Sequence, residues 1–342
     1  MNLKETIFAL SSAEGVTGPE SAATTLAQKL LAQYAPDASV DVLGSVTGTV
    51  GEGDKTIMLD AYLDQIHMVV TSHEDRGFVR IASAGGMDRR VLIGKPVTIF
   101  GHGTNPIHAI VSSVPPHLAS KGDTNLPDIT ELLIDTGLSV EQTHEMIGYG
   151  DPVIVDYQPQ TLLNGLITGP ALKNRCGVAA ILRCLDILKD EKLPCKVAVT
   201  FSAFGESNKG GAQTSAFRFN PEEAIVVDAV CAQQPGTPAE VRSKMGKGTV
   251  LCVSSALNRK VALTLRRLAK EQGIACQELG KGGHTGTNAD TIYNSVGGVA
   301  TGLLMIPMKN THTAVEIVDA ADVESTAQLM AAYIRNGGRD NG

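Results

Sequence analysis

The chain has 342 residues, of which 43% are hydrophobic and 19% are charged, a balance that excludes a disordered or fibrous protein. Its length favours one large domain plus a smaller one. The net charge of −7 and the lack of any long run of lysines and arginines argue against nucleic acid or an anionic membrane as the main partner.

The first 68 residues combine one predicted helix with predicted strands. No apolar stretch at the N-terminus has the length of a signal peptide, so we expect a cytoplasmic protein. The segment 17–34 opens with a capping-box pattern, Thr17-x-x-Glu20, and continues with leucines at helical spacing. The runs SVDVLGSVTGTVG (39–51) and TIMLDAYLD (56–64) are typical of strands, and the second is apolar enough to lie inside a sheet.

The pattern changes between residues 69 and 165. Short apolar runs separated by Gly, Pro, Asn and Asp predict a small β-barrel or sandwich. Within this segment, only SVEQTHEMI (139–147) is typical of a helix. The predicted strands are GFVRIAS, KPVTIFG, IHAIVSS, ELLIDTG and DPVIVDY.

The remainder of the chain has the pattern of an α/β sheet that is covered on both faces. The simplest architecture is one α/β domain, formed by residues 1–68 and 166–342, with a β domain (69–165) inserted into it. In chain order, the predicted elements after residue 170 are a helix at 174–192, the strands KVAVTFSAF, AIVVDAV and GTVLCVSS, a helix at 258–273, the strand VATGLLMIP and a helix at 322–336.

Four side chains of types that commonly bind metals follow predicted strands. Asp64, Glu206, Asp228 and His312 all stand at or after the carboxyl end of a strand, where open α/β sheets bind their ligands. Each residue alone has a plain structural explanation, such as a turn cap or a solvated loop position. Together they favour a divalent-metal site, because Asp, Glu and His are common ligands of such ions.

Two further features lie near these strand ends in the sequence. Lys173 stands at the start of a predicted helix, where the positive end of the helix dipole disfavours a cation. The Gly-rich segment GKGGHTGTNAD (280–290) lacks the spacing of a phosphate-binding loop, so we interpret it as a substrate-site loop.

Motifs are spread over nearly the whole chain: SSAEGVTGPE (11–20), SAGGMDRRVL (83–92), LLIDTGLSVEQTHEMIGYGDPV (132–153), KNRCGVAA (173–180), TGTNADTI (285–292) and IPMKNTHTAVE (306–316). They resemble those of the cytosolic metallo-aminopeptidases of peptidase family M42, which include glutamyl and deblocking aminopeptidases and proteins labelled cellulase M or endoglucanase. The resemblance implies a zinc-peptidase-like (phosphorylase/hydrolase-like) three-layer α/β domain with an inserted small β-barrel domain for oligomerisation or substrate access. It also implies small peptide substrates and homo-oligomers built from dimers, with a dodecamer as one candidate.

The family site holds two divalent metals such as zinc, cobalt or manganese. Carried over by motif, the resemblance implies that Glu206, Asp228 and His312 are metal ligands. It also implies that Asp64 corresponds to the aspartate that orients the first histidine ligand. These four positions coincide with those found at the strand ends.

Three other site positions depart from the family pattern. Tyr62 stands in place of the first histidine ligand, Lys173 in place of the bridging aspartate and Gly205 in place of the general base. Asn288 stands where an aspartate is common, which is a milder change. Glu206, Asp228 and Lys173 sum to −1, and an ammonium cannot ligate a metal while protonated, so we expect at most one metal and no two-metal site.

Two functions remain open at this point. The first is hydrolysis of small peptides by an altered or single-metal site, in which Asp64 and Lys173 are the candidate catalytic residues and His67 or His284 could replace the lost histidine. Lys173 could act as a base only if burial lowered its pKa, which Glu206 and Asp228 oppose. The second is a catalytically inactive relative in which Lys173 pairs with acidic residues and replaces the metals.

Overall fold

The computed structural model describes residues 1–16, 21–101, 106–115, 117–118, 126–238, 240–241 and 243–340. The chain divides into two compact units. The α/β unit comprises Met1–Gln65, Gln158–Thr311 and Val315–Gly342, and the barrel unit comprises Ile66–Tyr157 and His312–Ala314. Among the described residues, no helix is long and apolar enough to cross a membrane.

An 11-stranded mixed sheet forms the centre of the α/β unit. β3 (Thr56–Tyr62) pairs in parallel with both β12 (Lys196–Ser202) and β13 (Glu223–Cys231), and β13 pairs in parallel with β16 (Ala300–Lys309). These four strands therefore bring their carboxyl ends to one edge, where such sheets carry their sites. The other strands are β1 (Ser39–Val40), β2 (Val46–Val50), β10 (Gln160–Thr161), β11 (Leu166–Gly169), β14 (Thr249–Ser254), β15 (Cys276–Lys281) and β17 (Glu316–Asp319).

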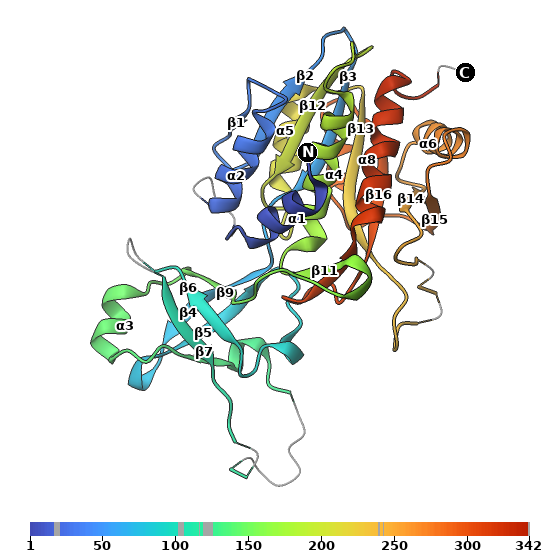
Figure 1. Cartoon of the computed structure of the whole chain (residues 1–342). Helices are drawn as coiled ribbons and strands as arrows, with labels where there is room; N and C mark the ends of the chain where they lie inside the picture. Colours follow the sequence, from blue (N-terminus) through green and yellow to red (C-terminus); the bar gives the residue numbers. More distant parts are fainter. Residues whose placement is uncertain are drawn as a thin grey trace. The chain divides into compact units, whose positions relative to one another are not determined.

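Helices cover both faces of this sheet because successive residues of its strands point to opposite sides. In β3, Ile57, Leu59 and Ala61 join one core, whereas Met58 joins the other. α4 and α8 lie side by side on the first core (Figure 1). The first core includes α1 (Leu3–Ser12), α2 (Ala22–Leu31), α4 (Leu172–Leu188), α6 (Arg259–Glu271) and α8 (Ala320–Arg335), and the second includes α5 (Gly210–Phe219) and α7 (Ala289–Ile292).

The barrel unit is a closed six-stranded barrel in the order β4-β5-β8-β7-β6-β9. Alternate residues of its strands fill a core of its own, and α3 (Val140–Met146) contacts β4 and the neighbouring turn. The predicted α/β fold with a small inserted β-barrel is thus confirmed. The strands are β4 (His67–His73), β5 (Phe78–Ala84), β6 (Pro96–Ile99), β7 (Ile107–Val111), β8 (Leu133–Asp135) and β9 (Pro152–Val155).

Individual elements differ from the sequence prediction. α1 and α5 were not predicted, and β13 continues to Cys231 rather than ending at Asp228. The predicted capping pair Thr17 and Glu20 lies outside the described residues. The described helix α2 begins at Ala22, with the Ser21 side chain as its N-cap.

Candidate active site

The carboxyl end of β3 and the segment directly after it supply two buried side chains, Tyr62 and Asp64. The Asp64 carboxylate accepts hydrogen bonds from the backbone N–H groups of Gly205 (2.8 Å) and Glu206 (3.3 Å). Burial raises the pKa of Asp64 to about 6, while these two N–H groups act in the opposite direction. Asp64 therefore fixes the loop after β12 against the end of β3, and this loop carries Glu206.

Lys173 and Tyr62 both donate to Glu206. The Lys173 ammonium lies 3.0 Å from Oε1 and 3.3 Å from Oε2 of Glu206, and the Tyr62 hydroxyl donates to the same Oε1 over 3.0 Å. The side chains of Lys173 and Glu206 are only 18% and 8% exposed. The ammonium also lies 5.5 Å from the centroid of the Tyr62 ring, within the range of a cation–π contact. Three side chains from separate elements thus form one buried polar cluster.

Lys173 is held in its charged form. Burial acts to lower the pKa of Lys173, but the carboxylates of Glu206, Asp228 and Glu316 outweigh burial and raise the pKa above its ordinary value. The shift has the wrong direction for a neutral catalytic base. The pKa of the Tyr62 hydroxyl is raised well above its usual range, first by burial and then by nearby carboxylates, so Tyr62 stays neutral.

The helix start at Lys173 is stabilised by an acid from a distant part of the chain. Ala171 adopts a left-handed conformation (φ 54°) without a side-chain cap, and α4 begins at the next residue. Glu316, the buried first residue of β17, accepts a hydrogen bond from the Lys173 backbone N–H over 2.7 Å. This carboxylate offsets the unfavourable placement of a cation at a helix N-terminus. Sequence reasoning missed Glu316, because 143 positions separate the two residues.

Asp228 lies within β13 and is 6% exposed. Its Oδ1 accepts a hydrogen bond from the Ala229 backbone N–H over 2.7 Å. Burial raises the pKa of Asp228 to about 6, whereas the positive charge of Lys173 lowers it. Asp228 therefore contributes negative charge to the surroundings of Lys173.

The sequence suggested three histidines as possible metal ligands. His312 belongs to the barrel unit, where its Nδ1 lies 2.6 Å from the carbonyl oxygen of Gly86. His67 is buried in β4 of the barrel unit, and the His284 side chain is 81% exposed, 4.0 Å from Asp290. Asn288 donates to Asp60 and Ser202 in the α/β unit.

The residues present do not fit a pair of divalent metals. Glu206 Oε1 already accepts from an ammonium and a phenol, neither of which ligates a metal in its protonated form. A Cβ atom on Gly205 would lie 2.1 Å from Cγ and 2.2 Å from Cβ of Tyr62, so this backbone has no room for an acidic side chain. Within the described residues, no group of three or more His, Cys, Asp and Glu side chains could hold a metal ion.

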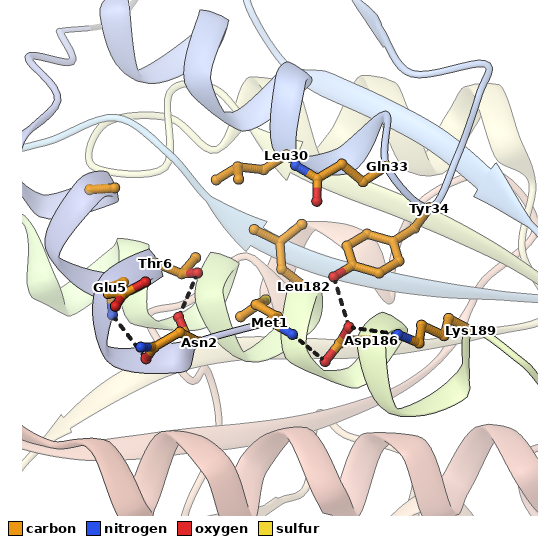
Figure 2. Close-up of a pocket in the computed structure, with 11 residues that line it drawn as sticks. Met1, Asn2, Glu5, Thr6, Leu30, Gln33, Tyr34, Leu182, Asp186 and Lys189 are labelled. Atoms are coloured by element: carbon orange, nitrogen blue, oxygen red, sulfur yellow. Dashed lines mark hydrogen bonds and ion pairs between the residues drawn. The ribbon is translucent and has the colours of Figure 1, made fainter.

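A separate cavity of about 550 Å³ lies among α1, α2 and α4 and contains none of the predicted site residues (Figure 2). Its main polar group, the Asp186 carboxylate, interacts with the Met1 amino group (3.0 Å), the Tyr34 hydroxyl (3.2 Å) and Lys189 (3.9 Å). Asp186 also bonds Arg183 over 2.7 Å. Because its acid is already paired with several donors, we assign this cavity no role.

The covered α/β sheet and the closed six-stranded barrel form the fold of the zinc-peptidase-like class. The family model described as M42 glutamyl aminopeptidase matches residues 44–329, and the chain belongs to this family. The sequence is 27% identical over 325 residues to a lysyl aminopeptidase of Pyrococcus furiosus, an alignment that covers 94% of this chain and 93% of the relative.

Two solved structures show the same fold over almost the whole chain. An aminopeptidase from the archaeon Desulfurococcus kamchatkensis is 29% identical, with a TM-score of 0.89, and the match covers 97% of this chain and 94% of the other. The TET1 peptidase of Pyrococcus horikoshii, which can assemble into a tetrahedron or a large octahedral shell, is 26% identical, with a TM-score of 0.85 and coverages of 97% and 99%.

Proposed function

We propose that this chain is a member of the aminopeptidase family that has lost two-metal hydrolysis and keeps the fold as a binding or structural protein. The observation that carries the proposal is the Lys173 ammonium, 3.0 Å from Glu206 Oε1, at the position that resembles the metal-bridging acid. A buried ammonium bound to an acid supplies the positive charge that metals supply elsewhere in the family. The same ammonium repels a divalent cation.

The lack of a general base supports the same proposal. A general base typically contributes ~10²–10⁴-fold to the rate of a reaction that involves proton transfer, such as hydrolysis, and glycine at position 205 has no side chain that could accept a proton. Tyr62 packs against Gly205, and its hydroxyl is held by Glu206. Tyr62 and Gly205 therefore form a matched pair, and restoring the histidine at position 62 alone would not restore a general base.

The alternative is a weak or altered hydrolase, which the similarity to aminopeptidases over the whole chain favours. Both alternatives retain small peptides as ligands, and in both Asp64 acts by positioning the loop that carries Glu206. The assemblies of the related TET peptidase also support a large homo-oligomer for this chain, which sedimentation measurements would test. The cytoplasmic location expected from the sequence stays a prediction.

The test is an activity assay of the full chain against a panel of aminoacyl substrates. It is run with zinc, cobalt or manganese added and again with a chelator. We expect no turnover above background in any condition, with retained binding of small peptides measured by calorimetry. Metal-dependent turnover that the chelator abolishes would establish the altered hydrolase and overturn the proposal.

A further inference from the structure

A buried carboxyl–carboxamide pair joins β3 to the segment that leads into α7. Asn288 Nδ2 donates to Asp60 Oδ2 over 2.8 Å and to Ser202 Oγ over 2.9 Å. Asp60 is 0% exposed and Asn288 is 1% exposed. Among the residues that the structure describes, the second oxygen of each side chain, Asp60 Oδ1 and Asn288 Oδ1, has no hydrogen-bond partner.

Two unpartnered oxygens on one hydrogen-bonded pair have a simple chemical explanation. An ionised carboxylate only accepts hydrogen bonds, and so does the oxygen of a carboxamide, so the two cannot satisfy each other. A protonated carboxyl group has one O–H donor. One proton on Asp60 would therefore satisfy both oxygens at once, in a two-bond ring with the amide.

We propose that Asp60 binds a buried proton and donates it to Asn288 Oδ1, so that an acid–amide ring anchors the segment around Asn288 to β3. The surroundings favour the neutral acid. Among the residues that the structure describes, Asp228 in β13 is the ionisable group that acts on Asp60, and its negative charge opposes ionisation. The contacts from β12 and from the start of α7 are the uncharged Ser202 and Asn288.

The anchor is sensitive to pH in the neutral range. Burial raises the pKa of Asp60 from 3.8 to about 7, against the opposing effect of the bonds from Asn288 and Ser202. Because the folded pKa is the higher one, the stabilising contribution of this proton is complete below about pH 4. It decreases as pH rises and is lost above about pH 7. Ionisation then leaves one bond of the ring and a fully buried charge.

The test compares Asp60→Asn with the wild-type chain in urea unfolding at pH 5 and pH 8. An amide at position 60 can donate permanently to Asn288 Oδ1 and accept from Nδ2, so the variant should fold and lose this pH dependence. Relative to the variant, the wild-type unfolding constant should rise roughly 100-fold between the two pH values, as linkage gives for these pKa values.

Asp322→Asn is the matched control. Asp322 is also buried with a raised pKa, about 6, but its oxygens accept from the backbone N–H groups of Gly246 and Gly248, each over 2.7 Å. An asparagine at position 322 would place its side-chain NH₂ group against one of these backbone N–H groups. This variant should therefore be less stable than the wild-type chain at both pH values. An Asp60→Asn variant that resembles this control, fails to fold, or keeps the wild-type pH dependence would overturn the proposal. A protonated-carboxyl infrared band at pH 6 that Asp60→Asn removes would support it.

Discussion

Replacement of Lys173 by methionine tests whether the ammonium holds the acidic site together. The substitution keeps an unbranched side chain and removes the charge, leaving Glu206 without the cation it pairs with and Asp228 with less positive charge nearby. Removing one partner of a buried ion pair costs ~3–5 kcal/mol. Because the Lys173 side chain is still 18% exposed, we expect the lower end of this range, about 3 kcal/mol of unfolding free energy at pH 8.

The stability that Lys173→Met loses should increase with pH. The pKa of Asp228 is already about 6 with Lys173 beside it, and removing the cation raises it further. An acid with a raised folded pKa destabilises the protein at high pH, and this penalty disappears when the acid is protonated. Lys173→Met should therefore lose more stability at pH 8 than at pH 5.

Urea unfolding followed by circular dichroism measures both effects. Adding Glu206→Gln to Lys173→Met removes the second charge of the pair, so the double variant should be more stable than the sum of the two single losses predicts. The reasoning would be refuted if Lys173→Met stayed within about 0.5 kcal/mol of wild type, the usual range of surface substitutions, or if the two losses were additive.

Three further substitutions, two of them with a control, test the packing and hydrogen bonds around the site. Gly205→Ala should lower the free energy of unfolding by about 1–3 kcal/mol, because its Cβ would overlap Tyr62. The control Gly297→Ala, with no atom within 4 Å of the added Cβ, should lower it by less than about 1 kcal/mol in the same thermal unfolding assay. Glu316→Ala should remove the cap of α4 and cost about 1–2 kcal/mol, and Glu316→Gln, which retains an acceptor, should cost less. Arg175→Lys should cost at least about 2 kcal/mol despite its conserved charge, because the buried guanidinium donates to Leu10, Ala13, Gly15, Leu63 and Gln65; an unchanged melting temperature would contradict this role.

Local patterns predicted most of the fold. The apolar run TIMLDAYLD contains β3, and the five short runs predicted after residue 69 correspond to β5, β6, β7, β8 and β9 of the closed barrel, whereas β4 was not predicted. α5 was missed because it begins with two glycines and follows Lys209, which has a left-handed backbone and no capping side chain. The Gly211 position needs glycine for tertiary reasons, since a Cβ there would lie 2.5 Å from backbone atoms of Ala203.

The site was only partly predictable for a similar reason. The strand-end rule selected Asp64, Glu206 and Asp228, because it depends on topology that the hydrophobic pattern encodes, and the role of these residues in a metal site stays a prediction. The sequence pattern did not indicate that the Tyr62 hydroxyl bonds Glu206, or that Glu316 caps the helix at Lys173, because both contacts join residues more than 140 positions apart. Such contacts depend on side-chain orientation after folding, which no local periodicity specifies.

The most direct test of the proposed metal-free site is the metal content of the purified protein after incubation with zinc, cobalt or manganese and removal of the excess. The comparison is a Tyr62→His, Lys173→Asp variant, which keeps Gly205 because its surroundings have no room for a larger side chain. We predict little bound metal in the wild-type chain and clearly more in the double variant. One or two tightly bound metal ions per wild-type chain would contradict the account.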